Sequence, residues 1–364
     1  MERAKYLSVL VVAGTRPEIV KMGPVITELE RTSTPYVFLN SGQHYDFELS
    51  QLFIQELGLP EPNINLRLSA SNPSEQIAEM ILKISRIIRN TRPTLVAVQG
   101  DTNTVLATAL AANREGAKVA HVEAGLRSYD LRMPEEYNRR LADHLSDVLF
   151  APTHHNKQTL LGEKVCGRIE ITGNTVVDAI QQYWHLAQNE SIDFPYESYI
   201  LATIHRAENV DSKDVLREFV RVFKEAPFPV VLPLHPRTKK RLKQFGLWRR
   251  LIGDGSQVQV LKPVGYLRFL RLMKYCTCIL TDSGGVQEEV TSPLIRKRFV
   301  LMRISTERPE AVKAGFGVVA GCKAAVILRE LGRVVTMKKP PPARSPYGDG
   351  RASRRICTYL RSTL

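Results

Sequence analysis

The sequence predicts an α/β protein built from two doubly wound parallel sheets, and three observations carry this prediction. Short apolar runs typical of buried strands alternate with stretches of helical periodicity along the whole chain. The 364 residues exceed one ordinary core and suit two domains of common size. A polar, turn-rich segment, NESIDFPYES, separates the two series of elements. We therefore expect two Rossmann-like domains that face each other across a cleft.

The first series of elements predicts an N-terminal domain over residues 1–188. Its expected strands are 7–13, 36–40, 95–98, 119–122, 148–151 and 169–172, and its expected helices are 17–30, 47–57, 74–90, 104–115, 136–146 and 176–187. The clearest helix runs from Ser74 to Asn90, because six apolar residues recur there on one face. Ser74 is its predicted N-cap.

The second series predicts a C-terminal domain over residues 189–345. Its expected strands are 199–204, 229–234, 258–261, 278–280 and 299–302, with helices between them. The stretch KKPPPARSP then predicts a stiff polar connection. The remaining residues, 346–364, contain a predicted helix over 349–360 that we expect to pack back on the N-terminal domain.

Composition limits the compartment and the partners. No apolar run is long enough to cross a bilayer, and the brief opening run LSVLVVAG lacks the cleavage site of a secretory signal, so we expect a cytoplasmic protein with no membrane partner. Five scattered cysteines favour neither a zinc site nor a disulfide framework. The formal charge of +14 suits an anionic partner. Its basic runs lack interleaved aromatic residues, so we expect phosphates or a nucleotide sugar and no nucleic acid.

Polar loops follow nearly every predicted strand. They read GTRPE, SGQHYD, QGDTN, VEAGLRS, GNTVVD, TIHRAEN, LHPRT, TDSGGVQEE and STERPE. In open parallel sheets the ligand crevice lies beyond the carboxyl ends of the strands, so nine such loops predict one binding crevice. Glu123 just after one strand and Glu135 at a helix start are then candidate catalytic groups. Glu136 is interpreted as a complement to the helix dipole.

The loop TDSGGVQEE predicts a phosphate site. Ser283, Gly284 and Gly285 open a helix, where free amides and the positive end of the dipole receive phosphate oxygens. Glu289 is a candidate partner for ribose hydroxyls, although a surface carboxylate explains it equally well. The loop matches neither the GxGxxG fingerprint nor a Walker A motif, which disfavours NAD and ATP.

With GTRPE, HVEAGLRS, TDSGGVQEE and STERPEAV together, the chain closely resembles the non-hydrolysing UDP-N-acetylglucosamine 2-epimerases. The resemblance runs from Val12 to Gly321 and resumes at Pro346 to Gly350. It implies the two-domain fold of one glycosyltransferase superfamily (GT-B type), a homodimer, and a reversible conversion of UDP-N-acetylglucosamine to UDP-N-acetylmannosamine for polysaccharide synthesis. It implies neither a metal nor another cofactor.

The resemblance also implies a mechanism, in which UDP is eliminated to leave a 2-acetamidoglucal and is then added back with inversion at carbon 2. Asp101, Glu123 and Glu135 match the family's catalytic carboxylates, and His205 matches its histidine near the leaving phosphate. Two of these residues also have purely structural interpretations. Asp101 could cap the helix that follows, and His205 could be a satisfied structural histidine.

Further residues match the family's contacts with its ligands. The substrate contacts implied are Arg16, Lys21, His235, Phe269, Ser283, Gly284, Gly285, Glu289 and Arg308. Phe269 lies among leucines and would, taken alone, be interpreted as core. A regulatory nucleotide-sugar site is implied at Gln43, His44 and Arg206. The chain departs from the family at VTSPLIRKRFVLMRIS, which is two residues longer and lacks a glycine.

Three other functions remain open from the sequence. A hydrolysing 2-epimerase would release UDP and free N-acetylmannosamine, but such enzymes resemble GTRADY where this chain has GTRPE. A glycosyltransferase of the same fold would need an acceptor site. A nucleotide-sugar sensor without turnover would lose one of Asp101, Glu123 or Glu135, and all three are present.

Overall fold

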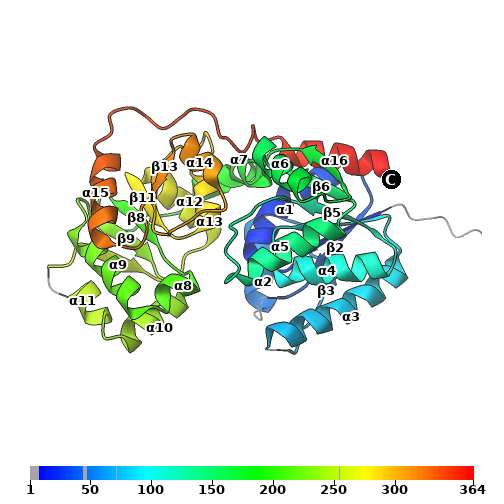
Figure 1. Ribbon diagram of the computed structural model, residues 1–364, viewed down its shortest axis with the longest axis horizontal. Helices are drawn as coiled ribbons and strands as arrows, with labels where there is room; N and C mark the ends of the chain where they lie inside the picture. The colour runs from blue at the N-terminus through cyan, green and yellow to red at the C-terminus, as the bar shows by residue number, and fades with distance from the viewer. Residues whose placement is uncertain (1–7, 44–46, 71, 254) are drawn as a thin grey trace, which may run out of the picture. The chain divides into compact units, whose positions relative to one another are not determined.

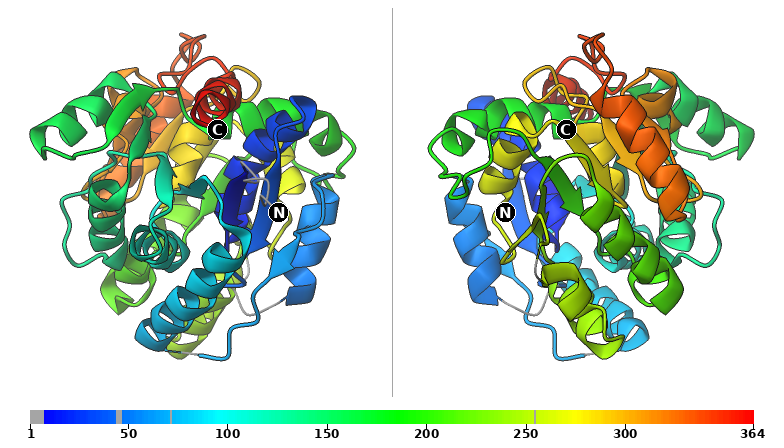
Figure 2. Two further views of the ribbon diagram at one scale, coloured as in Figure 1. Left: turned by 90° about the vertical axis from the view of Figure 1, so that its right-hand side faces the viewer. Right: turned by 90° about the vertical axis from the view of Figure 1, so that its left-hand side faces the viewer.

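The computed structural model describes residues 8–43, 47–70, 72–253 and 255–364 (Figure 1). The chain divides into two compact units. Unit 1 comprises the described residues up to Gln182 together with Tyr347–Leu364, and unit 2 comprises Tyr183–Pro346. Each unit has its own parallel sheet with helices packed on it (Figures 1 and 2). The predicted fold class, α/β with two doubly wound parallel sheets, is confirmed.

The sheet of unit 1 has seven strands in the order β3-β2-β1-β4-β5-β6-β7. Its strands are β1 (Val9–Ala13), β2 (Tyr36–Asn40), β3 (Ile64–Asn65), β4 (Leu95–Gln99), β5 (Lys118–Val122), β6 (Val148–Ala151) and β7 (Arg168–Ile171). β1 and β4 are buried throughout, as their continuous apolar sequences predict for strands covered on both faces. The strand order reverses direction between β1 and β4.

The helices of unit 1 connect these strands. They are α1 (Arg16–Arg31), α2 (Phe47–Glu56), α3 (Pro73–Thr91), α4 (Asn103–Arg114), α5 (Pro134–Leu145), α6 (His154–Gly162), α7 (Thr175–Ala187) and α16 (Ala352–Thr363). The residues of α7 from Tyr183 on belong to unit 2. Right-handed crossovers place α3, α4 and α5 on the face opposite α1, because the chain reverses direction after β3. α16 packs on α1, where Cys357 Sγ lies 3.5 Å from the Val25 carbonyl oxygen.

The sheet of unit 2 repeats this topology with six strands in the order β10-β9-β8-β11-β12-β13. Its strands are β8 (Ile200–Thr203), β9 (Val230–Pro233), β10 (Val258–Leu261), β11 (Cys278–Thr281), β12 (Phe299–Leu301) and β13 (Gly317–Val319). Its helices are α8 (Ala207–Val210), α9 (Lys213–Glu225), α10 (Pro236–Gln244), α11 (Trp248–Ile252), α12 (Tyr266–Tyr275), α13 (Gly284–Glu289), α14 (Pro309–Lys313) and α15 (Ala324–Val335). The reversal lies between β8 and β11.

The predicted polar connection, residues 338–346, contains neither helix nor strand. Two arginines of the segment that departs from the family hold it. Arg296 Nε donates to the Pro341 carbonyl oxygen at 3.0 Å, and Arg298 Nη2 donates to that of Lys339 at 2.8 Å. Thr291 Oγ1 also lies 2.6 Å from Ser345 Oγ. The longer segment is therefore folded against the connection.

Some local predictions differ from the structure. β3, β13 and α6 were not predicted; β3 and β13 are very short, and the sequence of α6, HHNKQTLLG, lacks an apolar face. The N-cap of α3 is Asn72 rather than Ser74, because the Asn72 side chain accepts the amide of Ser74. In the described part of the chain, no helix is long and apolar enough to span a membrane.

Candidate active site

The predicted contacts His235, Phe269 and Arg308 follow β9, β10 and β12. The loops that carry the predicted catalytic residues and the predicted phosphate site follow strands at or next to the two reversal points. In unit 1 these are the loops after β1 and β4, joined by the loop after the neighbouring β5. In unit 2 they are the loops after β8 and β11. Ligands of open parallel sheets bind at such points, because the connections there diverge to opposite faces.

Glu123 lies directly after β5. Its backbone φ of 68° is a left-handed value that residues other than glycine rarely adopt. Its side chain is 5% exposed, and its carboxylate forms an ion pair with Lys21 of α1. Gln99 Nε2 at the end of β4 donates to the same oxygen at 2.7 Å. A buried carboxylate held by a cation and an amide donor at a strained position is typical of functional sites rather than surfaces.

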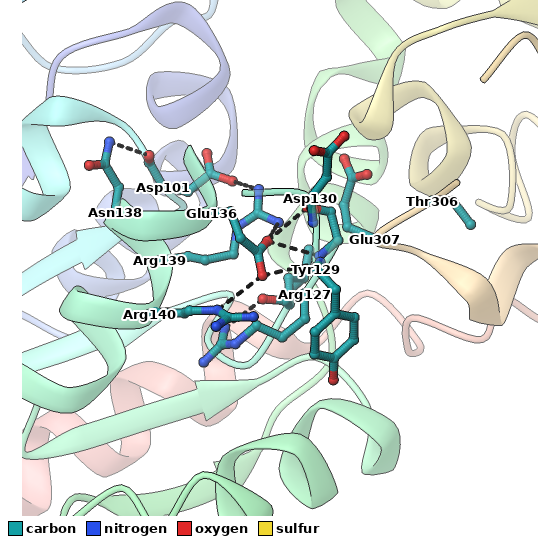
Figure 3. Close-up of polar contacts among 12 residues, drawn as sticks. Asp101, Arg127, Tyr129, Asp130, Glu136, Asn138, Arg139, Arg140, Thr306 and Glu307 are labelled. Carbon is teal, nitrogen blue, oxygen red and sulfur yellow. Dashed lines mark hydrogen bonds and ion pairs between the residues drawn. The ribbon is translucent and has the colours of Figure 1, made fainter. Parts of the chain in front are cut away.

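Asp101 is fixed by a different cation. Arg139 Nη2 of α5 donates to Asp101 Oδ2 at 2.5 Å, and Asn138 Nδ2 donates to the Asp101 carbonyl oxygen at 3.0 Å (Figure 3). The side chain of Asp101 stays 31% exposed. Thr102, not Asp101, caps α4 through its hydroxyl. The capping interpretation of Asp101 is therefore wrong.

Glu135 and Glu136 begin α5 but have different environments. Glu135 is half-buried, and within the described chain its side chain has no hydrogen-bond or ion-pair partner. Glu136 is fully buried and accepts from Ser128 Oγ at 2.8 Å and Arg139 Nη1 at 3.0 Å. Figure 3 shows its carboxylate beside Arg139 and Arg140. Glu136 therefore organises the loop before α5 and orients Arg139, so its interpretation as a simple dipole complement was wrong.

The start of α1 is already occupied by a carboxylate of the chain itself. Glu18 Oε2 accepts the amides of Gly14 and Thr15 at 2.7 Å each, and Glu18 Oε1 accepts the hydroxyl of Thr102. Burial raises the pKa of Glu18 to about 7, against the opposing effect of these donors. Arg16, at the first position of the helix, is exposed and lies 5.6 Å from the ring centre of Phe53. Lys21, one and a half turns on, lies against Glu123.

In unit 2, a buried aspartate holds His205. Asp282 accepts the amides of His205 and Arg206, and the side-chain amide of Asn209, all between 3.0 and 3.1 Å. His205 Nδ1 lies 3.3 Å from Asp282 Oδ1. Burial lowers the pKa of His205, and Asp282 opposes that shift. His235, which caps α10, is exposed with its ring centre 6.2 Å from that of His205.

Arg308 is buried beneath α13. Its Nη1 donates to Glu307 Oε1 at 2.6 Å, and its Nε lies 2.9 Å from Glu288 Oε1. A side chain at Gly284 would come within 2.4 Å of Arg308 Nη1, whereas one at Gly285 would meet nothing within 4 Å. The packing of the chain thus requires glycine at 284 but leaves open space over 285.

The remaining predicted contacts of unit 2 lie around α12 and α13. Ser283 is the N-cap of α13, and its amide donates to Thr281 Oγ1 at 2.9 Å. Glu289 ends that helix and is half-buried. Phe269 is also half-buried, in the first turn of α12, while the flanking Leu270 is fully buried. One edge of Phe269 is therefore left to solvent, unlike a core residue.

The predicted regulatory residues are engaged within their own units. Gln43 Oε1 accepts the amide and the hydroxyl of Thr104 at 2.9 and 2.8 Å. Arg206 Nη2 lies 3.3 Å from Glu307 Oε1. His44 lies outside the described residues.

Several organising residues were missed by the sequence analysis. They are Glu18, Gln99, Asp282 and Glu307. Glu18 and Glu307 lie in the strand-end loops GTRPE and STERPE, and Gln99 and Asp282 stand at strand ends. Their nearness in sequence to predicted site residues and strand ends was the only sign of their importance. The residues that they bind lie far away in the sequence, so their roles could not be predicted.

The fold and the site define an α/β protein whose two sheets carry, at their reversal points, carboxylates held by cations in one unit and a histidine with buried arginines in the other. The family model described as UDP-N-acetylglucosamine 2-epimerase matches residues 27–361. The chain belongs to this family, which confirms the resemblance predicted from its motifs.

Individual proteins named as 2-epimerases are similar to the chain over nearly its whole length. The chain is 40% identical to UDP-N-acetylglucosamine 2-epimerase of Methanocaldococcus jannaschii, with 96% of this chain and 98% of that one covered. A crystal structure of the M. jannaschii enzyme in complex with UDP-GlcNAc and UDP superposes with a TM-score of 0.90 at 39% identity, covering 98% of this chain and all of that one. The chain is also 36% identical to UDP-2,3-diacetamido-2,3-dideoxy-D-glucuronate 2-epimerase of Pseudomonas aeruginosa, with 97% of this chain and 99% of that one covered.

Proposed function

We propose that the chain interconverts UDP-N-acetylglucosamine and UDP-N-acetylmannosamine by inverting carbon 2 of the sugar. The family and the similarity to the M. jannaschii enzyme, whose crystal contains UDP-GlcNAc and UDP, support this substrate. One observation in the structure supports the chemistry most strongly. Asp101, Glu123 and Glu135 follow the adjacent strands β4 and β5, and two of them are each held by a buried cation.

The reaction begins with elimination. A carboxylate of unit 1 takes the proton from carbon 2, the C–H electrons form a double bond between carbons 1 and 2, and the C1–O bond breaks with its electrons leaving on UDP. The products are a 2-acetamidoglucal and UDP. Lys21 and Arg139 favour the ionised forms of Glu123 and Asp101, which suits proton removal.

Re-addition reverses these steps, except that the proton reaches carbon 2 from the other face of the ring while UDP returns to carbon 1 from the face it left. A second carboxyl group gives its proton to carbon 2, and the UDP oxygen attacks carbon 1. Glu135, at the start of α5, is proposed as the donor of this proton. In the reverse reaction the two groups exchange roles.

The diphosphate is proposed to bind through the cations of the predicted site. His205, oriented by Asp282, would face the leaving phosphate, and Arg16 and Arg308 would meet its charge. The open space over Gly285 suits an oxygen approaching the backbone of α13.

Phe269 is proposed to contact the uracil and Glu289 the ribose. His235 and Ser283 are proposed as further contacts, and Gln43 with Arg206 as a second nucleotide-sugar site. We further propose that the protein is a cytoplasmic homodimer whose product is used in polysaccharide synthesis.

The Pseudomonas relative is named for the same inversion on a diacetamido glucuronate sugar, so the two substrates should be compared directly. Purified protein is given each UDP sugar, and the products are separated by anion-exchange chromatography. We expect UDP-N-acetylmannosamine from UDP-N-acetylglucosamine, with a higher kcat/KM than for the diacetamido sugar. Free N-acetylmannosamine with UDP would instead identify a hydrolysing epimerase.

A separate experiment tests bond cleavage. UDP-N-acetylglucosamine labelled with ¹⁸O at the C1–O–P bridge is incubated with the protein and recovered. Elimination frees the β-phosphate, so the label should spread to its non-bridging oxygens at a rate comparable to epimerisation. A label that stays in the bridge while carbon 2 inverts would contradict departure of UDP.

A further inference from the structure

His121 lies near the end of β5, two residues before Glu123, and is completely buried. Its Nδ1 is 2.8 Å from Asp143 Oδ1 of α5, and its Nε2 is 2.7 Å from the carbonyl oxygen of Gly100. A carbonyl oxygen can only accept, and so can an ionised carboxylate. Each ring nitrogen therefore needs its own hydrogen, which only the imidazolium form provides.

The surrounding charges agree with a protonated ring. Arg127 Nη2 lies 2.7 Å from Asp143 Oδ2 and 2.6 Å from Glu163 Oε2. Arg140 also acts on Glu163, whose side chain is 25% exposed, so Arg127, Arg140 and a protonated His121 together meet the two anions of the cluster.

The strands on either side of His121 add no charge. Its neighbours in register are Val98 on β4 and Leu149 on β6. Burial alone lowers the pKa of His121, but the bonds to Asp143 and to the Gly100 carbonyl outweigh it, so the net shift is upward. Arg127 opposes that rise, and Asp143 has a lowered pKa despite its burial because it faces both His121 and Arg127.

This cluster touches both loops that carry the unit 1 carboxylates. Gly100, held by the ring, immediately precedes Asp101. Asp143 Oδ2 also accepts the amide of Gly125 at 3.2 Å, two residues after Glu123. One buried aspartate and one histidine thus connect the loop after β4 to the loop after β5.

We propose that His121 is a positioning residue that works as a fixed imidazolium. Through Nε2 it holds the Gly100 carbonyl and so the backbone of Asp101, and through Asp143 it couples that loop to the one carrying Glu123. It does not touch substrate. The kinetic consequence rests on the proposed epimerase function, while the protonation state does not.

The protonation state is measured first, by NMR of the full chain labelled with ¹⁵N-histidine, without substrate. His121 signals are assigned by through-bond correlation to the backbone. We expect both ring nitrogens of His121 to stay protonated at pH 8, whereas in denaturant the same residue titrates near ~6.5. An unprotonated ring nitrogen on His121 in the folded protein at pH 7 would overturn the proposal, whatever the activity.

The kinetic test compares His121→Gln with His155→Gln, the same change at an exposed position on α6. His121→Gln should lower kcat on the order of 10²-fold with KM changed by less than about threefold, because binding groups remain while Asp101 is misplaced. His155→Gln should match the unaltered protein. An unchanged kcat in His121→Gln would contradict the positioning role.

Asp143→Asn provides a readout that does not depend on His121→Gln folding. Loss of the anion lowers the pKa of His121, so the imidazolium is lost at lower pH than in the unaltered protein. The variant's kcat should therefore fall on the alkaline side at a lower pH, in step with the NMR titration of His121. A kcat profile that keeps its shape while His121 loses its proton would reject the proposal. If the unaltered protein lacked epimerase activity but kept a cationic His121, the proposed function would fail and the charge assignment would stand.

Discussion

Lys21 of α1 and Glu123 after β5 form an ion pair in which both side chains are almost fully buried, at 9% and 5% exposure. The two residues are 102 positions apart in the sequence, and the pair fixes the first helix of unit 1 to the strand end that carries a proposed catalytic group. The sequence predicted Lys21 as a contact with the substrate. The structure places it on a carboxylate, so its first role is to hold Glu123.

This pair separates stability from activity. Lys21→Met leaves a buried carboxylate without its ammonium, which should lower the free energy of unfolding by about 3–5 kcal/mol. The double variant Lys21→Met with Glu123→Gln removes both charges and should regain most of that stability while remaining inactive. Denaturant unfolding and a turnover assay measure the two properties. A double variant as unstable as the single one would show that charge pairing is not the cause.

Glu135 and Glu136 provide a matched pair of adjacent carboxylates. Glu135→Gln should reduce turnover by about 10²–10⁴-fold and leave stability unchanged, because the side chain is half-buried and has no partner in the described chain. Glu136→Gln should instead lower the free energy of unfolding by about 1–3 kcal/mol, because it leaves buried donors of the loop and Arg139 poorly satisfied. Thermal unfolding measures the stability of both variants, and kcat measures their turnover. A loss of stability in Glu135→Gln would contradict the catalytic role proposed for Glu135.

Gly284 and Gly285 separate packing from ligand binding. Gly284→Ala places a methyl group against Arg308 and Glu307, which are buried and bound to each other, and should cost about 1–3 kcal/mol of stability. Gly285→Ala meets no atom of the chain and should leave the melting temperature unchanged or slightly raised. Its affinity for UDP, measured by calorimetry, should nevertheless fall. Unchanged UDP affinity in Gly285→Ala would place the phosphates elsewhere.

Glu18 predicts a pH dependence of stability. The folded protein keeps the Glu18 proton up to a pKa of about 7, whereas the unfolded chain releases it near 4.5. The folded state therefore binds more protons between these values, and this group's contribution to stability is lost as the pH rises through about 7.

The Glu18→Gln variant lacks the group that titrates, and so lacks this pH-dependent contribution to stability. Its free energy of unfolding relative to the unaltered protein should rise by about 3 kcal/mol between pH 4.5 and pH 8. Chemical unfolding of both proteins at several pH values gives the difference, in which the other titrating groups cancel. A difference that is constant with pH would show that Glu18 is ionised throughout.

The strands were largely predictable because their sequences are continuous apolar runs. Tyr36–Asn40, Val148–Ala151 and Val258–Leu261 have the predicted bounds. The caps were harder, since Asn72 and Ser74, or Asp101 and Thr102, are equally good capping residues one or two positions apart. Only the path of the backbone decides which side chain reaches the free amide.

The predicted site residues differ in how far local sequence could reveal them. Glu123 and Glu135 were predicted from their positions after a strand and at a helix start, and their catalytic roles stay predictions. The groups that hold Glu123 and Asp101 could not be predicted, because Lys21 and Arg139 meet these carboxylates across more than thirty residues of sequence. Charged residues such as Glu136 and Asp282 resemble surface residues in sequence and become buried only through such contacts.

Incubation with UDP-N-acetylglucosamine in heavy water, followed by NMR, tests the proposed inversion most directly. The proposal predicts deuterium at carbon 2 of both UDP-N-acetylglucosamine and UDP-N-acetylmannosamine, with the bond to UDP intact in each. Conversion between the two sugars without deuterium at carbon 2, or no exchange and no conversion at all, would contradict it.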